Sequence, residues 1–168
     1  YNALAGTCVG LACGLTLDEI QEGIEGAQTI SGRNNIIHTE NYTIMDDCYN
    51  ANPVSMKASL DVLATDLGRK VAILEDMGEL GADEASLHYT VGEHAAKKQI
   101  DLLLCVGTLS EEIVKGAKSV NPEMNAHLFA SKEELLAKLP ELLADKDSIL
   151  IKASHFMQFE KIVAALQS

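Results

Sequence analysis

The sequence predicts an α/β fold: a Rossmann-like, mainly parallel sheet with helices on both faces, preceded by a short helical segment. Hydrophobic residues make up 47% of the 168 residues but aromatic residues only 4%, so the core must be aliphatic, as in sheets of Val, Ile and Leu covered by helices. After residue 30, short apolar runs alternate with segments of helical periodicity. Such alternation is typical of right-handed βαβ crossovers, which cover both faces of a sheet.

The first 30 residues are expected to form two helices. Residues 1–14 are rich in Ala, Gly and Cys, whose small side chains let a helix approach its neighbours closely, and we expect a buried helix here. Thr16 and Glu19 have the spacing of a capping box, which predicts a second helix over residues 17–25. Because the chain begins at Tyr1 inside a helix, we expect this beginning to be a cut in a longer protein, which says nothing about targeting.

The pattern changes after Ser31 and Gly32, and we expect a domain boundary near residue 30. Two β-rich runs, residues 35–38 and 43–45, predict a hairpin at the start of the new unit. Pro53 follows Asn52 at the expected start of a helix. The apolar stripe of that helix should consist of Met56, Leu60, Leu63, Ala64 and Leu67.

The remaining elements are expected in regular alternation. Buried strands are predicted at residues 71–74, 102–106, 126–129 and 148–151. Helices are predicted around residues 87–95, 113–117, 131–143 and 159–166. Ser131 and Glu134 make a second capping box, and Pro140 is expected to kink or shorten the helix that they begin.

Charge and composition exclude several classes of partner. The formal net charge of −12 repels polyanions, so we expect neither nucleic acid nor anionic membrane as a partner. No apolar run is long enough to cross a bilayer, so no membrane insertion is expected. The four cysteines have no C-x-x-C spacing and the five histidines no i, i+4 spacing, so we expect buried free thiols in a reducing compartment and no metal site built by this chain alone.

Ligands of parallel sheets bind beyond the carboxyl ends of the strands, so polar residues that follow predicted strands are candidate ligand contacts. The densest such stretch is residues 46–53, which holds two carboxylates, a phenol and two carboxamides and suits a hydroxyl-rich ligand such as ribose. Asn52 by itself is better interpreted as a helix cap, and Asp46 and Asp47 could be solvated turn residues. For the cluster as a whole we favour binding.

Two later loops carry weaker candidates. Asp76 and Glu79 follow the strand at residues 71–74 and could hold an ammonium group, although their spacing alone favours solvated surface acids. Lys152, Ser154 and His155 follow the last strand, where a cation and two hydrogen-bonding groups could meet a carboxylate or phosphate. A surface Lys is nevertheless commoner than a ligand-binding one.

Arg33 lies beside Gly32 at the expected boundary, and its planar guanidinium could pair with phosphate, although a lone Arg is ordinarily solvated. Neither G-x-x-x-x-G-K-[ST] nor G-x-G-x-x-G occurs in the sequence, so the chain has no recognisable backbone cradle for a di- or triphosphate. If the chain meets a nucleotide, another domain must hold most of it.

Several motifs occur in a family-specific order over nearly the whole chain. They are N-A-L-A at residues 2–5, G-R at 32–33, D-D-C-Y-N-A-N-P-V-S-M-K-A at 46–58, G-R-K-V-A-I-L-E-D-M-G-E-L-G at 68–81, L-H at 87–88 and V-G at 91–92. Together they resemble the Mur ligase family, in its branch that adds D-alanyl-D-alanine to UDP-N-acetylmuramoyl-tripeptide. The resemblance implies an ATP-dependent, amide-forming ligase of cytoplasmic peptidoglycan precursor synthesis.

The resemblance also implies a division of labour. Residues 1–30 would end a central ATPase domain, which holds most of the ATP and Mg²⁺, and residues 31–168 would form the C-terminal domain, inactive by itself. It implies ATP contacts for Asn2 beside the adenine, Arg33 at the phosphates and Asp47 at the ribose, with Tyr49, Asn50 and Asn52 completing the loop. Contacts on the substrate side are expected for Asp76, Glu79, His88, Lys152, Ser154 and His155, and no catalytic residue is assigned.

Two positions depart from the family pattern. Glu75 precedes Asp76 and Met77 where the family usually has G-D-M, and His155 ends a loop that is usually K-G-S-R. The second change replaces a permanent charge with one that depends on pH. Two other classes of function stay open on the residues alone: a non-catalytic Rossmann-like module that binds a nucleotide or peptide, and a purely structural domain.

Overall fold

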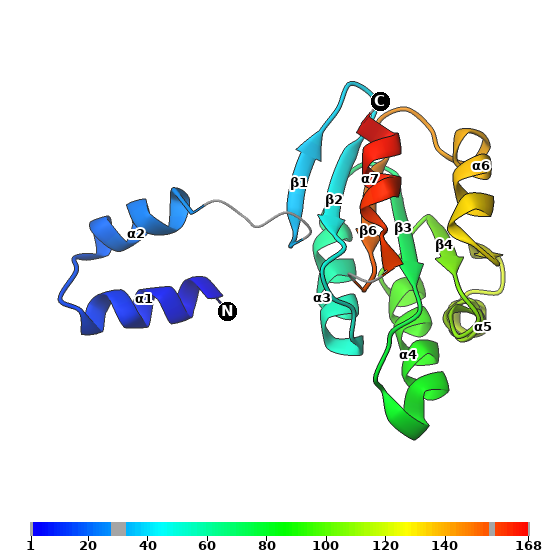
Figure 1. Cartoon of the computed structure of the whole chain (residues 1–168), viewed down its shortest axis with the longest axis horizontal. Helices are drawn as coiled ribbons and strands as arrows, with labels where there is room; N and C mark the ends of the chain where they lie inside the picture. The colour runs from blue at the N-terminus through cyan, green and yellow to red at the C-terminus, as the bar shows by residue number, and fades with distance from the viewer. Residues whose placement is uncertain (1, 28–32, 155–156, 168) are drawn as a thin grey trace. The chain divides into compact units, whose positions relative to one another are not determined.

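The computed structural model describes residues 2–27, 33–154 and 157–167 of the chain. The chain divides into two compact units, Tyr1–Ile30 and Ser31–Ser168. The second unit contains a six-stranded sheet covered by helices, which confirms the predicted α/β class (Figure 1).

The first unit consists of α1 (Asn2–Ala12) and α2 (Leu17–Glu25). The capping box predicted for α2 is present, since the Thr16 side chain accepts from the Glu19 N–H and the Glu19 carboxylate accepts from the Thr16 N–H at 2.8 Å. The observed helix has the predicted range, residues 17–25, and the capping box explains why it begins at Leu17.

The two helices of this unit approach each other closely at a residue with no side chain, Gly10. A Cβ placed on Gly10 would lie only 2.6 Å from Cγ1 of Ile20, so Gly10 permits the contact. The prediction that the first helix is buried is wrong, because Leu4 and Val9 are 66% and 63% exposed and only Gly10 of α1 is buried. Within the described residues of this unit, α1 packs against α2. A single neighbouring helix covers only a narrow stripe of α1, so the rest of its surface stays exposed.

The sheet of the second unit has the strand order β1-β2-β6-β3-β4-β5. Its strands are β1 (Asn35–His38), β2 (Thr43–Asp47), β3 (Lys70–Glu75), β4 (Leu102–Val106), β5 (Asn125–Phe129) and β6 (Ser148–Lys152). The predicted hairpin is confirmed, because β1 and β2 pair antiparallel, and the other neighbours pair parallel. The carboxyl ends of β2, β6 and β3 therefore lie side by side at one edge.

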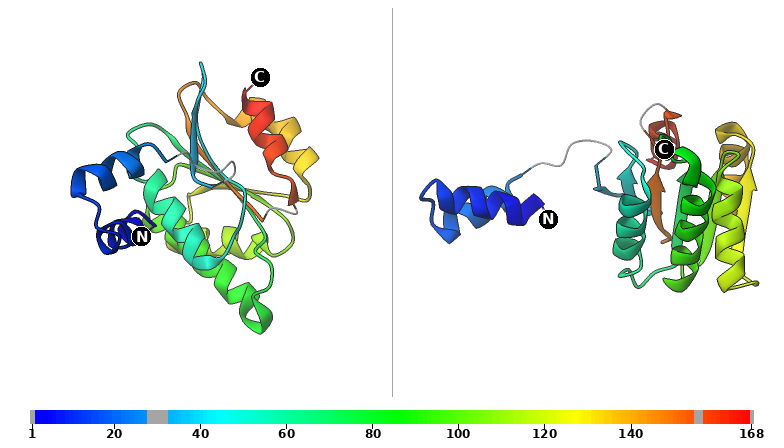
Figure 2. Two further views of the ribbon diagram at one scale, coloured as in Figure 1. Left: turned by 60° about the vertical axis from the view of Figure 1, so that its left-hand side comes forward. Right: turned by 90° about the horizontal axis from the view of Figure 1, so that it is seen from below.

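Helices cover both faces of the sheet, as predicted (Figures 1 and 2). One face packs against α3 (Pro53–Leu63), α4 (Glu84–Lys97) and α5 (Ser110–Val120), and the other against α6 (Lys132–Leu142) and α7 (Glu160–Gln167). A short 3-10 helix, Gly81–Asp83, precedes α4. The helices α4 and α5 cross at backbone contact distance, because a Cβ on Gly92 would lie 1.8 Å from the carbonyl oxygen of Ile113.

Some local predictions fail. The helix α3 ends at Leu63 and Leu67 is fully exposed, because residues 64–66 turn away before the strand that follows. The capping box predicted at α6 forms only in half: Ser131 Oγ accepts from the Glu134 N–H, but the Glu134 carboxylate accepts from the Ala130 N–H instead of from the N–H of Ser131. Pro140 lies inside α6, which ends two residues later at Leu142.

All four cysteines are free, and the expectation that they are buried holds for Cys48 and Cys105 but not for Cys8 and Cys13, which lie in the first unit. Among the described residues, none of the helices is both long and apolar enough to cross a bilayer. The same residues contain no group of three or more His, Cys, Asp or Glu side chains arranged to hold a metal ion.

Candidate functional site

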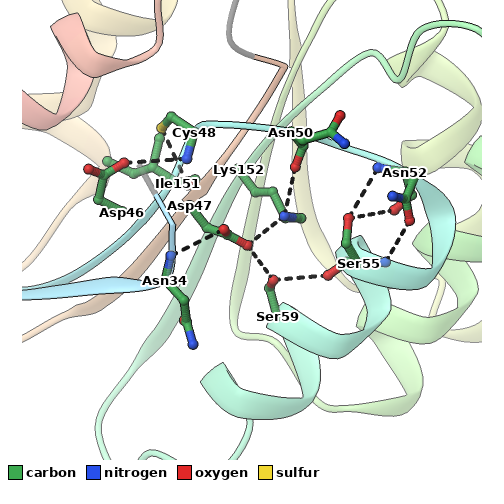
Figure 3. A network of polar contacts seen from close by, with 10 residues as sticks. All are labelled: Asn34, Asp46, Asp47, Cys48, Asn50, Asn52, Ser55, Ser59, Ile151 and Lys152. Atoms are coloured by element: carbon green, nitrogen blue, oxygen red, sulfur yellow. Dashed lines mark hydrogen bonds and ion pairs between the residues drawn. The ribbon is translucent and has the colours of Figure 1, made fainter. Parts of the chain in front are cut away.

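The candidate site is built at the carboxyl ends of β2 and β6. Asp47 and Lys152 are the last residues of these two parallel strands and lie opposite each other in the strand register. Both side chains point to the sheet face that α3 covers, where Ser59 lies (Figure 3). The sequence thus brings together two charged residues that are 105 positions apart.

The two oxygens of the Asp47 carboxylate have different surroundings. Oδ2 accepts from Lys152 Nζ at 2.5 Å and from Ser59 Oγ at 2.7 Å (Figure 3). Oδ1 accepts only from the backbone N–H of Asn34, at 3.2 Å, among the residues that the structure describes. Because the Asp47 side chain is 15% exposed, Oδ1 keeps capacity to accept a further hydrogen bond from a ligand hydroxyl.

The turn at residues 48–52 is fixed from inside. Asp46 Oδ1 accepts from the Cys48 N–H at 3.3 Å, and the Cys48 thiol donates to the carbonyl oxygen of Ile151. Burial, and then the nearby Asp46 carboxylate, raises the pKa of this thiol, so it stays protonated as a donor. The carbonyl oxygen of Asn50 accepts from Lys152 Nζ at 2.9 Å.

Asn52 caps α3, as expected for that residue alone. Its side chain accepts from the Ser55 N–H at 2.9 Å, and the Ser55 hydroxyl accepts from the Asn52 N–H in return. The cap fixes where the turn ends and leaves the carboxamide of Asn52 only partly exposed.

Arg33 and Tyr49 form the exposed part of the site. The guanidinium carbon of Arg33 lies 3.8 Å from the centre of the Tyr49 ring, a cation–π contact. Tyr49 is 43% exposed. Stacking uses the flat face of the guanidinium and leaves its N–H groups directed outward in its plane, where they can meet an anion.

The second predicted loop, after β3, is held by two polar side chains. The Asp76 carboxylate accepts from the backbone N–H groups of Leu109 and Ser110, at 3.1 and 2.6 Å, and so caps the start of α5. His88 is fully buried and contacts the backbone of the loop at Met77. Glu79 is exposed and has a positive φ of 60°.

Glu75 is a buried acid at the carboxyl end of β3. It is 2% exposed, and its Oε2 has no hydrogen-bond partner among the described residues. Burial, and then the charge of Asp76, raises the pKa of Glu75 to about 8. It lines a cavity of about 370 Å³ whose other walls are Val106, Gly107, Ala130, Ser131, Lys132, Glu133, Met157 and Gln158.

Of the remaining candidates, Ser154 makes no hydrogen bond to Asp47 or Lys152 among the described residues. Ser154 is buried at 6% exposure, two residues after Lys152. Asn2 is an exposed residue of α1 in the first unit, so its grouping with the others stays a prediction. His155 lies outside the described residues.

Sequence reasoning missed Ser59 and Asn34, which both donate to Asp47. Ser59 could have been found, because it is a polar residue on the buried side of α3, three positions after Met56 and four before Leu63. Asn34 donates through its backbone N–H, which any residue except proline could supply, so the sequence gives no signal for this contact.

Comparison with known proteins places these residues in a family context. The family described as Mur ligase, glutamate ligase domain, matches residues 32–155. The UDP-N-acetylmuramoyl-tripeptide--D-alanyl-D-alanine ligases of Escherichia coli K12 and Bacillus subtilis 168 are 38% and 32% identical, over 99% and 98% of this chain. The chain spans only 36% and 37% of the length of these two relatives.

Solved structures of the same family are also similar to this chain. A crystal structure of MurF from Acinetobacter baumannii superposes with a TM-score of 0.86 at 34% identity and covers 99% of this chain, which spans 37% of that one. MurF ligase from Thermotoga maritima, crystallised in complex with ADP, superposes with a TM-score of 0.79 at 25% identity over 95% of this chain, which spans 35% of that one. The fold agrees over both units of the chain.

Proposed function

This chain belongs to the Mur ligase family, and on that premise we propose that it is the C-terminal part of an ATP-dependent ligase that joins D-alanyl-D-alanine to UDP-N-acetylmuramoyl-tripeptide. The names of the relatives support this choice of substrates. Since the chain spans about a third of their length, the complete reaction belongs to a longer protein. Residues 31–168 would be its C-terminal domain, and residues 1–30 the end of a central ATPase domain.

The observation that carries the nucleotide half of the proposal is the asymmetry of the Asp47 carboxylate. Oδ2 is used inside the protein, whereas Oδ1 has one long hydrogen bond and spare capacity at a partly exposed position. A carboxylate oxygen with free lone pairs fits the vicinal hydroxyls of a ribose. The Thermotoga maritima relative was crystallised in complex with ADP, which supports a nucleotide as the ligand of this proposal.

Arg33 and Tyr49 would lie toward the phosphates. The stacked guanidinium offers several N–H donors to a phosphate oxygen, and the ring holds it in place. Asn50 and Asn52 complete the turn beside Asp47, and Asn2 would contact the adenine. Mg²⁺ would be held by the central domain, and we assign no magnesium ligand to the described residues.

The loops after β3 and β6 would face the dipeptide. Glu79, exposed at the tip of its loop, is suited to the dipeptide ammonium group. Asp76 and His88 would shape that loop, because both are committed to backbone N–H groups. Ser154 and His155 would complete the dipeptide contacts. The bound ATP supplies activation of the tripeptide carboxylate as an acyl phosphate, and these loops would hold the dipeptide amine for attack.

The exposed apolar side chains of α1 fit the same proposal. Leu4, Val9 and Leu11 are all exposed on α1, and they would pack against the rest of the central domain in the complete ligase, since removing apolar surface from water is favourable. We further propose that the ligase works in the cytoplasm, where free thiols such as Cys8 and Cys13 stay reduced.

Phosphate release tests the proposal. With ATP, D-alanyl-D-alanine and UDP-N-acetylmuramoyl-tripeptide, the full-length ligase should release phosphate only when all three substrates are present, and this chain alone should release none. Steady turnover by the chain alone would contradict its assignment as an inactive part. If calorimetry shows that the full-length protein binds an unrelated nucleotide but does not bind D-alanyl-D-alanine, a non-catalytic binding module would be favoured instead.

A further inference from the structure

Lys152 was expected to contact the substrate, but its surroundings suit a different task. The residue is 1% exposed, and its Nζ lies between Asp47 Oδ2 and the carbonyl oxygen of Asn50 (Figure 3). Both acceptors belong to the protein. A buried ammonium group is tolerated only when it is paired and hydrogen-bonded, and here both conditions are met within the chain.

The pair is built into the sheet. Asp47 and Lys152 are directly opposite in the β2–β6 ladder, so the backbone already sets the distance between their side chains. Lys152 Nζ and Ser59 Oγ reach Oδ2 from different elements, β6 and α3. With two donors on Oδ2, the carboxylate cannot rotate freely, and the position of Oδ1 is fixed as well.

The same ammonium group also fixes the turn. By donating to the Asn50 carbonyl, Lys152 ties the middle of residues 48–52 to the end of β6. Tyr49, which stacks on Arg33, precedes Asn50 in this turn. One buried cation therefore sets the orientation of the carboxylate and the position of the residue that supports Arg33.

We propose that Lys152 is a positioning residue for the nucleotide: it orients Asp47 Oδ1 toward the ribose hydroxyls and fixes the turn that carries Tyr49, without touching any substrate. This inference rests on the proposed role of Asp47. It assigns the geometry of the Asp47 carboxylate to a residue at the start of the proposed dipeptide loop, so that β6 would support the nucleotide and the dipeptide sides at once.

The chain offers a matched control at the opposite end of β6. Arg69 Nη1 pairs with Asp147 Oδ2 at 2.9 Å, and Asp147 is 1% exposed. Asp147 immediately precedes β6, whereas Lys152 ends it. Removing Arg69 thus breaks an ion pair whose buried partner, Asp147, adjoins the other end of β6, away from the proposed nucleotide edge.

The test is calorimetric titration of the full-length ligase with ADP and with 2′,3′-dideoxy-ADP. Hydrogen bonds from the ribose to a charged group should make ADP bind about 10- to 100-fold more tightly in the unmodified protein. Lys152→Met should bring the ratio of the two dissociation constants to within about threefold of one, whereas Arg69→Met should keep it. A merely structural ion pair would lower the denaturation midpoint in both variants and leave the ratio unchanged in both.

The outcomes separate the two claims. If the unmodified ligase does not distinguish ADP from the dideoxy analogue, the role of Asp47 in the proposed function fails. If it does, but Lys152→Met keeps the ratio, the positioning role is overturned. Should Lys152→Met not fold, Ser59→Ala removes the other donor to Oδ2 without stranding a charge, and it should lower the ratio severalfold; an unchanged ratio would overturn the proposal.

Discussion

The imidazole Nε2 of His88 accepts a hydrogen bond from the backbone N–H of Met77 at 2.8 Å. The other ring nitrogen, Nδ1, lies 2.7 Å from the carbonyl oxygen of Glu84 and must donate to it. The ring is thus held as the neutral tautomer with its proton on Nδ1. His88 closes the loop after β3 by joining its first turn to the start of α4.

His88→Leu should destabilise the protein by about 1–3 kcal/mol, because the buried Met77 N–H loses its acceptor. His88→Gln should keep most of the stability, since its amide oxygen can take the position of Nε2. Urea unfolding of both variants checks this, and titration of the full-length ligase with D-alanyl-D-alanine should show weaker binding for the Leu variant only. Equal unfolding midpoints for the two variants would count against the loop-closing role.

Glu75 should make the stability of the chain fall as pH rises. Its folded-state pKa is raised to about 8 from an ordinary value of 4.5, so the folded state holds a proton that the unfolded state has lost between these two values. The stabilising effect of that proton is complete below about pH 4.5 and is lost as pH rises through 8, at up to about 1.4 kcal/mol per pH unit.

The Glu75→Gln variant tests this pH dependence. Relative to the unmodified protein, it should gain stability progressively between pH 5 and pH 8 in urea unfolding. Glu133→Gln, on the exposed wall of the same cavity, should leave the difference near zero. A pH-independent difference for Glu75→Gln would mean that the acid is ionised in the folded protein.

Gly92→Ala should destabilise the sheet unit severely, by more than about 2 kcal/mol, because the new methyl group meets the Ile113 carbonyl oxygen and backbone cannot give way cheaply. Gly23→Ala is the matched control: no atom lies within 4 Å of its Cβ, and Ala favours the helix α2. Thermal unfolding should show a lowered midpoint for the first variant only. A normal midpoint for Gly92→Ala would contradict the close crossing of α4 and α5.

Tyr49 should act through its ring. Tyr49→Phe keeps the cation–π contact with Arg33 and should leave the affinity of the full-length ligase for ADP within about twofold. Tyr49→Ala should weaken it about two- to fivefold, the effect expected of an exposed cation–π contact worth about 0.5–1 kcal/mol. Equal affinities for the Phe and Ala variants would show that the ring does not support Arg33 in the complex.

Much of this architecture could be predicted from the sequence, because it depends on local patterns. The cap at Asn52 and the box at Thr16 and Glu19 involve residues three positions apart. The strands β3, β4 and β6 are short runs dominated by Val, Ile and Leu. The cluster at residues 46–53 was visible for the same reason. These features require no knowledge of which strands are neighbours.

The partnership of Asp47 with Lys152 could not be predicted in this way. It depends on β6 being inserted between β2 and β3, a long-range arrangement that periodicity does not encode. The exposure of Leu67 could not be predicted for a different reason. Apolar residues continue at helical spacing past Leu63, but Thr65 and Asp66 donate to carbonyls only three residues back, so the α-helix ends before Leu67. Likewise, the lack of a hydrogen-bond partner for Glu75 Oε2 within the described ranges depends on side chains that come together only in the fold.

Asp47 is proposed to form part of the ATP site of a D-alanyl-D-alanine-adding ligase, and steady-state kinetics of Asp47→Ala in the full-length ligase are the sharpest test of this role. The apparent KM for ATP should rise at least about tenfold while the KM for D-alanyl-D-alanine stays within about twofold, because the variant loses the charged oxygen that would bond the ribose. An unchanged KM for ATP would show that Asp47 does not contact the nucleotide.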